Sequence, residues 1–364
     1  MSDDILGVTI HGEQCNLCDL HDRLEREYPV SDARVQEMVH RIKRRGRRYK
    51  YDCLVGISGG SDSSYLLYWA YINDLRVLAF HFDNGFNHDF AERNMTRLVE
   101  ATGVDLIRIR INAHEYNDIN IAFLNASVSD CDIPNDIAMS SLMLDLAVRY
   151  DVKTILNGHN FRTEGSCPVG WTYMDGRYIE DVYAQTMYSM LNSYPQLTIR
   201  QQVKASLKGV HQERPFYHMA CTKEENRGLL QQEFGWESYT GWHCENAYTQ
   251  FAGWVIYRKF GIDKRRVELS AKIRSGVINR KTAQLILEDP IQEPVEVVDR
   301  ILAKLNLRQV DFVQMLQKPR RLFTDFNTYH GQFVRYRWLI WLGYKLGFLP
   351  KTFYAKYTRR LTTN

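Results

Sequence analysis

The sequence predicts an α/β protein that is built on a parallel sheet and ends in a mostly helical C-terminal region. Short apolar segments alternate with helix-like segments between residues 51 and 157, a pattern typical of parallel strands joined by right-handed helical crossovers. Repeated helical spacing then dominates residues 268–316. We therefore expect an N-terminal segment over residues 1–50, a sheet domain over residues 51–265 and a helical region over residues 266–364.

The expected elements follow from local patterns. Residues 53–57 are apolar and predict a buried strand, which a Gly/Ser loop and an apolar helix starting near Ser63 follow. The pattern over residues 180–215 is mixed and favours neither helix nor strand. The other expected elements are a strand over 77–82, a helix over 88–102, a strand over 106–110, a helix over 136–150 and a strand over 154–157.

The composition is that of an ordinary globular protein. The chain has 364 residues, of which 45% are hydrophobic and 25% charged, so it can bury a substantial core. Its net charge of +4 favours no particular class of partner. Seven cysteines without an apolar N-terminal segment favour a reducing compartment, so we expect a cytoplasmic protein. The apolar stretch over residues 338–344 is too short to span a bilayer, so we expect no membrane span.

The Gly/Ser loop after the first predicted strand is the first candidate site. Gly59 and Gly60 let the backbone approach a phosphate closely, and the following helix presents unpaired N–H groups and the positive end of its dipole. No lysine follows these glycines, so the loop favours gripping a departing pyrophosphate over transferring a terminal phosphate. We expect ATP to bind here. The predicted ATP-binding residues of the loop are Ser58, Gly59, Gly60, Ser61, Asp62 and Ser63.

Asp62 is the predicted magnesium ligand and a predicted catalytic residue. A carboxylate beside phosphates implies a divalent cation between them, and Mg²⁺ prefers oxygen ligands. The alternative interpretation of the loop is a helix cap on a turn of small residues.

Polar residues also follow other predicted strands. Asp83 and Asn84 end the second strand, where they could meet adenosine or magnesium at the same sheet edge as the loop. Gly158, Asn160 and Glu164 occupy an equivalent position after the fourth. The alternative in each case is an ordinary turn.

Three further stretches give the chain a family resemblance. They are residues 125–136, which begin Asn-Ala-Ser-Val-Ser-Asp, residues 157–165, which read Asn-Gly-His-Asn-Phe-Arg-Thr-Glu-Gly, and residues 241–249 together with 259–266. With the loop, these stretches resemble the N-acetyl sugar amidotransferases of lipopolysaccharide and flagellar-glycan pathways, which belong to the PP-loop ATP-pyrophosphatase superfamily. The resemblance covers roughly residues 10–290, and it implies the Rossmann-like fold of that superfamily.

The resemblance also implies a reaction. ATP would adenylate the acetamido group of a sugar, with or without a linked nucleotide, and release pyrophosphate; ammonia from a separate glutaminase subunit would then displace AMP and leave an acetamidino group. His243 and Glu245 are then the expected catalytic residues of the last stretch. Asn246, Lys264 and Arg265, together with Glu164, are the expected sugar-binding residues, because charges of this kind suit a phosphate or a carboxylate.

A cysteine pair suggests a zinc site in the N-terminal segment. Cys15 and Cys18 have the two-residue spacing that lets two thiolates share one zinc ion. A complete site needs His11, His21 or a distant ligand such as Cys244, which we include among the candidate metal ligands. The alternative is a pair of unpaired thiols.

Two other functions stay open at this point. A tRNA-thiolating enzyme of the same superfamily would use a cysteine pair such as Cys131 and Cys221, and a noncatalytic subunit would bind ATP as a scaffold. The basic run over residues 41–48 could contact nucleic acid, although a solvated helix is its commoner meaning, so nucleic acid is not an expected partner. The aromatic and basic C-terminal segment could dock on a partner or a membrane surface, or form an amphipathic helix that closes the domain.

Overall fold

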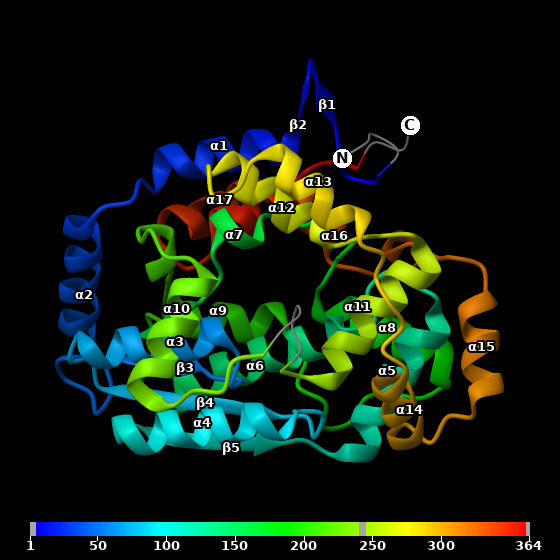
Figure 1. Cartoon of the computed structure of the whole chain (residues 1–364), viewed down its shortest axis with the longest axis horizontal. Coiled ribbons are helices and arrows are strands. Elements are labelled where there is room, and N and C mark those ends of the chain that lie inside the picture. Colours follow the sequence, from blue (N-terminus) through cyan, green and yellow to red (C-terminus); the bar gives the residue numbers. More distant parts are fainter. Residues whose placement is uncertain (1–4, 240–244, 362–364) are drawn as a thin grey trace.

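A parallel sheet of five strands forms the centre of the N-terminal half, as the sequence predicts. The computed structural model describes residues 5–239 and 245–361 (Figure 1). All strand pairs of this sheet are parallel, and the spatial order is β5-β4-β3-β6-β7. The strands are β3 (Cys53–Gly56), β4 (Val77–Asp83), β5 (Asp105–Arg110), β6 (Thr154–Leu156) and β7 (His211–Glu213).

The order of the strands places the Gly/Ser loop at a topological switch point. The chain leaves the central strand β3 toward β4 and β5, and then returns to β6 on the other side of β3. The connections after β3 and β6 therefore diverge at the carboxyl ends of these strands, where ligands of open α/β sheets bind. The loop over residues 57–60 leaves β3 at this point and leads into α3 (Ser61–Ile72).

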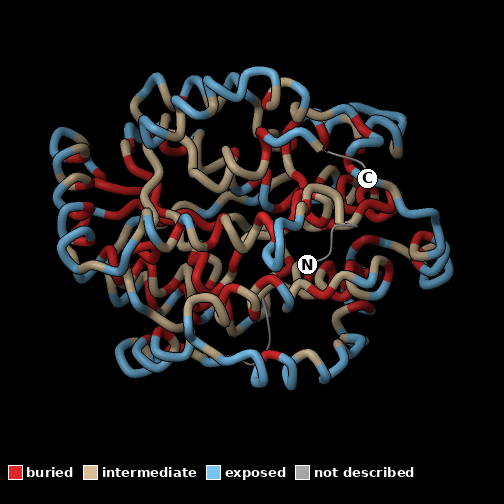
Figure 2. Tube along the Cα trace, turned by 90° about the horizontal axis from the view of Figure 1, so that it is seen from above, coloured by how far each residue is buried: buried red, intermediate tan, exposed pale blue. Residues whose placement is uncertain are grey.

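Helices cover both faces of the sheet because successive strand residues point to opposite sides. Val55 shares a core with apolar residues of α2 (Asp32–Gly46), α3 and α4 (Asp89–Thr102). Leu54 shares the opposite core with residues of α6 (Ile133–Arg149) and α9 (Ile199–Leu207). Figure 2 shows the resulting concentration of buried residues inside the molecule.

A second, helical core lies beside the sheet. Phe123, Phe251 and Phe312 are buried in it, and the rings of Phe251 and Phe312 are 5.5 Å apart. Five of its helices lie on the right of Figure 1. They come from both sides of residue 265, the expected boundary between the sheet domain and the helical region. The expected division of the chain into three parts stays a prediction. These five helices are α5 (Ala113–Ala126), α8 (Gly176–Met187), α11 (Ala247–Phe260), α14 (Val295–Lys304) and α15 (Gln309–Gln317). Buried residues of α6 and of the C-terminal segment, among them Phe333 and Tyr357, belong to the same core.

The remaining elements are short. Within residues 5–239 and 245–361, every helix is too short or too polar to span a bilayer. These elements are β1 (Ile10–His11), β2 (Gln14–Cys15), α1 (Asn16–Glu27), α7 (Phe161–Glu164), η1 (Pro215–Tyr217), α10 (Lys223–Phe234), α12 (Arg265–Arg274), α13 (Arg280–Glu288), η2 (Phe323–Asp325), α16 (His330–Arg335), α17 (Arg337–Lys345) and α18 (Lys351–Tyr357).

The structure corrects the predicted elements in three places. Helix α3 begins at Ser61 rather than near Ser63, and α6 begins at Ile133 rather than Asp136. Pro134 lies inside the first turn of α6, where the missing N–H group costs no hydrogen bond. The mixed region contains α9 and β7, and β7 lacks an apolar signal because it is a polar strand at the edge of the sheet.

Candidate functional site

A large cavity opens at the carboxyl ends of the central strands. Its volume is about 1220 Å³. The Gly/Ser loop lines one part of it, together with residues after β4 and β6 and the start of α10. The N-terminal parts of α6, α11 and α12 and most of α18 line other parts. Segments far apart in the sequence therefore share one space.

Hydrogen bonds among its own residues hold the Gly/Ser loop. Ser63 Oγ accepts a hydrogen bond from the Ser58 N–H group at 3.1 Å and donates one to the carbonyl of Gly60 at 3.2 Å. Ser58 Oγ lies 3.1 Å from Ser63 Oγ and accepts from the Gly60 N–H group at 3.3 Å. Gly60 precedes α3 and has no side chain to cap it, so the positive end of the helix dipole faces the cavity.

Both glycines of the loop are required by the surrounding structure. Gly59 has a φ of +80°, and a Cβ atom there would lie 2.1 Å from the carbonyl oxygen of Ala91 in α4. A Cβ atom at Gly60 would lie 2.8 Å from Glu245 Oε1. The loop thus packs closely against α4 and against Glu245, two residues before α11.

Asp62 forms an ion pair with Lys223 at the start of α10. The distance between Lys223 Nζ and Asp62 Oδ2 is 3.0 Å, and the Lys223 side chain is only 13% exposed. Burial would lower the pKa of Lys223, but the carboxylates of Asp62 and Glu164 outweigh burial and hold this pKa above its usual value. Lys223 is therefore a fixed positive charge beside the loop.

Arg227 follows Lys223 by one turn of α10. The two side chains share a face of the helix, and both line the cavity. The guanidinium of Arg227 lies over the ring of Tyr239, 4.9 Å from its centroid, and its Nε is buried without a hydrogen-bond partner in the described part of the chain. Helix α10 thus brings two cations to the loop.

Glu245 also lies against the loop. Tyr239 donates a hydrogen bond from its hydroxyl to Glu245 Oε2 at 3.1 Å, and both residues line the cavity. Burial, reinforced by the negative charge of Glu245, raises the pKa of Tyr239 above its usual value. The structure therefore brings the predicted catalytic residues Glu245 and Asp62 to one loop, whereas His243 lies outside the described residues.

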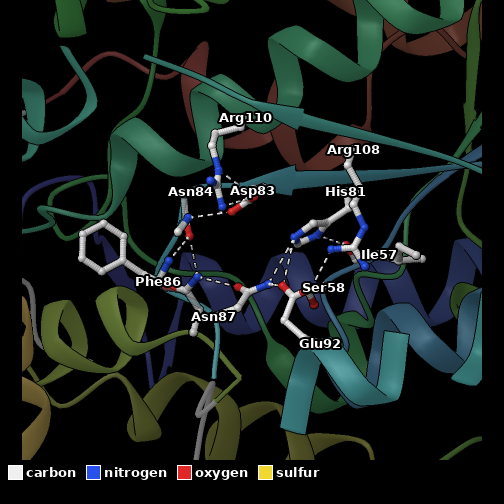
Figure 3. A network of polar contacts seen from close by, with 12 residues as sticks. Ile57, Ser58, His81, Asp83, Asn84, Phe86, Asn87, Glu92, Arg108 and Arg110 are labelled. Atoms are coloured by element: carbon white, nitrogen blue, oxygen red, sulfur yellow. Dashed lines mark hydrogen bonds and ion pairs between the residues drawn. The ribbon is translucent and has the colours of Figure 1, made fainter. Parts of the chain in front are cut away.

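A network of polar side chains connects the loop to Asn246, and Figure 3 labels His81, Asn84 and Asn87 of this network. Asn246 donates hydrogen bonds from Nδ2 to Asn84 Oδ1 at 3.0 Å and to Asn87 Oδ1 at 2.9 Å. Asn87 contacts His81 Nε2 at 3.2 Å, and His81 Nδ1 contacts the carbonyl of Ile57 at 2.9 Å. The start of the loop is thus tied to the N-terminus of α11. Asn84 and Asn246, which were both predicted, line the cavity.

The other predicted residues after β4 and β6 fall into two groups. Asp83 accepts a hydrogen bond from Arg110 Nε at 2.9 Å, and Asn160 caps α7 by accepting from the Arg162 N–H group; neither residue lines the cavity. Gly158 and Glu164 do line it. The assignments of Asp83 and Asn160 to ATP stay predictions, but both side chains have structural partners.

Lys264 marks a different part of the cavity wall. Its Nζ donates a hydrogen bond to Asp130 Oδ2 at 2.8 Å, and Thr172 donates to the same oxygen at 2.8 Å. Burial opposes charge on both groups, but their attraction raises the pKa of Lys264 and lowers that of Asp130. The guanidinium of Arg265, in contrast, is occupied by Asp263 and by the carbonyls of Ile286 and Asp289.

Lys356 of α18 faces the same region. Burial lowers the pKa of Lys356, and the positive charge of Lys264 lowers it further. Cys167 and Asp130 partly offset this decrease, and the pKa stays below its usual value. Both lysines line the cavity. We refer to Lys264, Lys356 and Asp130 as the lysine end of the cavity, and to residues 58–63 with Lys223 as the loop end.

The cysteine pair lies at the N-terminus of α1. Cys15 Sγ and Cys18 Sγ are 3.5 Å apart, and the hydrogen bond from Cys18 lowers the pKa of Cys15 to about 5. His11 is exposed in β1, and His21 Nε2 contacts Ser275 Oγ at 3.0 Å. Within the described ranges, no three or more His, Cys, Asp or Glu side chains gather in an arrangement that could hold a metal ion, and Cys244 lies outside these ranges. Zinc stays a prediction.

The cysteines that a thiolating enzyme would need are poorly placed for that role. Cys131 is buried, and burial raises the pKa of its thiol; burial also raises the pKa of Cys221 to about 11. Neither thiol lines the cavity.

Among the cavity residues to which the sequence analysis assigned no role are Lys223, Arg227, Asp130 and Lys356. The sequence does contain a signal for Lys223 and Arg227. The capping box that begins at Thr222 predicts the start of a helix, and the two cations, four residues apart, share one face of that helix. Asp130 belongs to a stretch that carries the family resemblance, but its role depends on contacts with distant segments. Lys356 has no local signal.

Comparisons with known proteins extend this description. The family model described as "LPS biosynthesis protein WbpG-like, C-terminal domain" matches residues 236–340. This match confirms the lipopolysaccharide-biosynthesis part of the predicted resemblance, and the matched segment contains Glu245, Asn246 and Lys264. A comparison with curated proteins gives no significant match.

Several solved structures are similar at low sequence identity. An NMN synthetase from Francisella tularensis has a TM-score of 0.37 and 9% identity, and the similarity covers 79% of this chain and 96% of that one. An NH3-dependent NAD synthetase from Campylobacter jejuni has a TM-score of 0.33 and 13% identity, with the same coverage. A U34-tRNA thiolase from Methanococcus maripaludis has a TM-score of 0.32 and 13% identity over 71% of this chain and 82% of that one. The chain thus joins a Gly/Ser loop at the switch point of a parallel sheet to a C-terminal segment that matches WbpG-like lipopolysaccharide biosynthesis proteins.

Proposed function

We propose that the protein is an ATP-dependent amidotransferase of surface-polysaccharide synthesis that converts the acetamido group of a sugar into an acetamidino group. One observation carries this proposal: a single cavity joins the Gly/Ser loop to Glu245, Asn246 and Lys264 of the segment that matches the lipopolysaccharide family. An ATP site and a sugar site in one cavity suit a reaction that couples the two.

The loop end suits the triphosphate of ATP. The N-terminus of α3 and the serine hydroxyls offer hydrogen-bond donors, and Lys223 and Arg227 offer positive charge to the departing pyrophosphate. Asp62 supplies the carboxylate oxygens that Mg²⁺ prefers. A bound Mg²⁺ would neutralise the phosphate oxygens and leave Lys223 free to pair with them instead of with Asp62.

The proposed chemistry has two steps. The acetamido carbonyl oxygen attacks the α-phosphorus of ATP, and the bond from this phosphorus to the bridging β-oxygen breaks, which releases pyrophosphate. Ammonia then adds to the activated carbon, and AMP leaves with the former carbonyl oxygen. The loop and its cations stabilise the charge of the leaving groups in both steps.

Glu245 is suited to proton transfer in the second step. Ammonia loses a proton when it adds to the activated carbon, so a proton acceptor is needed near the loop. Glu245 is that close, because its Oε1 atom would lie 2.8 Å from a Cβ atom at Gly60. Tyr239 holds the other carboxylate oxygen in place. We assign to Glu245 the role of accepting this proton, and His243 is proposed to assist.

The lysine end suits an anionic group of the sugar. Lys264 and Lys356 present two ammonium groups to the cavity, and a carboxylate or a nucleotide diphosphate would pair with both. Asn246 and Glu164 would contact hydroxyl groups. A separate glutaminase subunit is the proposed source of ammonia, and zinc at Cys15 and Cys18 would have a structural role.

The test is a direct assay of the reaction. The protein is incubated with ATP, Mg²⁺, an ammonium salt and candidate acetamido sugars, and mass spectrometry follows AMP and the sugar. We expect AMP together with a sugar lighter by the difference between O and NH. Formation of AMP only with tRNA and a sulfur donor would contradict the proposal, and so would the absence of AMP with every acetamido sugar tested.

A further inference from the structure

Helix α17 turns its apolar side chains toward solvent. Five large apolar side chains of this helix and the adjoining Leu346 are more than two fifths exposed, and Arg337 and Lys345 are exposed as well. At 3.6 residues per turn the five apolar side chains fall on one half of the helix. These five side chains are Trp338, Leu339, Trp341, Leu342 and Leu346, and we call them the α17 face.

The opposite half of α17 faces the protein. Ile340 packs against the helical core, and the hydroxyl of Tyr344 donates a hydrogen bond to Glu27 Oε1 of α1 at 2.5 Å. Lys351, at the start of α18, pairs with the same carboxylate. Helix α17 is therefore fixed in its orientation beside α1, where Figure 1 shows it.

This orientation is the reverse of that of an ordinary surface helix. A surface helix of a globular protein buries its apolar stripe and exposes its polar residues. Exposed apolar side chains are common singly, but a contiguous apolar surface marks a binding site. The α17 face therefore requires an occupant other than water.

The charge around the α17 face identifies the occupant. The chain carries seven Lys and Arg residues after Asp325 and no Asp or Glu. Arg335, Lys345, Arg359 and Arg360 are among the exposed ones. Tryptophan and leucine on one face of a helix, within a segment that is basic and has no acidic residue of its own, are the signature of a helix that lies in an anionic lipid interface. Glu27 of α1, which also lies beside α17, is paired with Tyr344 and Lys351.

We propose that the α17 face docks the protein on a membrane surface that contains anionic lipid. The tryptophan rings would lie at the level of the lipid headgroups, and the basic side chains would pair with the lipid phosphates. This proposal does not depend on the proposed amidotransferase reaction, because no residue of the α17 face lines the cavity.

The test compares vesicles of two compositions. The full-length protein is mixed with vesicles of phosphatidylcholine alone, or of an equal mixture of phosphatidylcholine and phosphatidylglycerol, and binding is measured by flotation. We expect binding to the mixed vesicles at least about ten-fold stronger than to the neutral ones, and weaker binding in high salt. The variant Trp338→Ser/Trp341→Ser is expected to lose binding while keeping its circular dichroism spectrum.

A matched variant controls for the removal of exposed apolar surface. Tyr188 is 93% exposed and Leu207 is 84% exposed, and neither belongs to the α17 face. The variant Tyr188→Ser/Leu207→Ser should bind the mixed vesicles like the unmodified protein. Equal loss in both variants would overturn the proposal, as would failure of the unmodified protein to float. If the unmodified protein fails to float and is a dimer that Trp338→Ser/Trp341→Ser dissociates, the face is a self-association surface and the membrane proposal is wrong.

Discussion

The two ends of the cavity are built in different ways. Apart from Lys223, the loop end takes its proposed phosphate-binding residues from six consecutive positions, and hydrogen bonds among these residues hold them together. The lysine end takes Asp130 from the connection before α6, Lys264 from the residue before α12 and Lys356 from α18. The comparison teaches that a contiguous site can be read from the sequence, whereas a site assembled from distant segments depends on the fold. Four substitutions test this division.

The largest expected effect is that of Asp62→Asn at the loop end. Loss of the carboxylate would remove the proposed Mg²⁺ ligand and lower the rate of pyrophosphate release by about 100-fold or more. The measurement is the rate of pyrophosphate release at saturating ATP. Asp311→Asn, which also breaks an ion pair but lies far from the cavity, should keep the normal rate. A normal rate in Asp62→Asn would remove the assignment of this residue.

Lys223→Met should follow with a loss of about 10-fold to 100-fold in kcat, because the variant lacks the charge that stabilises the departing pyrophosphate. Steady-state kinetics with varied ATP will measure it. Lys281→Met is the matched control, since Lys281 is exposed on α13 and does not line the cavity. An unchanged kcat in Lys223→Met would show that Lys223 only neutralises Asp62.

Gly59→Ala tests whether the loop needs its close approach to α4. The new Cβ atom would clash with the carbonyl of Ala91, and the alanine would have to adopt a positive φ. We therefore expect the free energy of unfolding to fall by about 2–4 kcal/mol. Gly103→Ala is the matched control, because Gly103 has a φ of +64° and no atom within 4 Å of the added Cβ. It should cost only about 1 kcal/mol. Urea denaturation compares the two, and equal losses would show that backbone strain alone requires Gly59.

Lys356→Met should give the smallest effect and separate the two ends. Removal of one cation from the lysine end should raise the KM for the anionic sugar by roughly 3-fold to 10-fold and leave the KM for ATP unchanged. Kinetics with each substrate varied in turn will measure both. If the KM for ATP rises instead, the lysine end belongs to the nucleotide site and the division of the cavity is wrong.

The predictable features were those with a local cause. The strands β3, β4 and β5 carry apolar or alternating patterns, and the positive φ of Gly59 explains the first glycine of the loop. The polar edge strand β7 has no such pattern, because pairing with β6 rather than burial defines it. The ion pair of Lys264 with Asp130 joins residues 134 positions apart, and no local pattern predicts such a contact. Asn246 was identified through the family resemblance, and its contacts with Asn84 and Asn87 explain its position.

The hydrogen bonds within the Gly/Ser loop also bear on how fast and how tightly a nucleotide can bind. A loop that becomes ordered only around its ligand subtracts the entropy of ordering from the affinity. Ser58 and Ser63 already fix the loop through each other and through Gly60. The entropy of ordering the loop is therefore lost when the protein folds and not when a nucleotide binds. Entry into the cavity should then limit the rate of nucleotide association, because the loop does not need to rearrange.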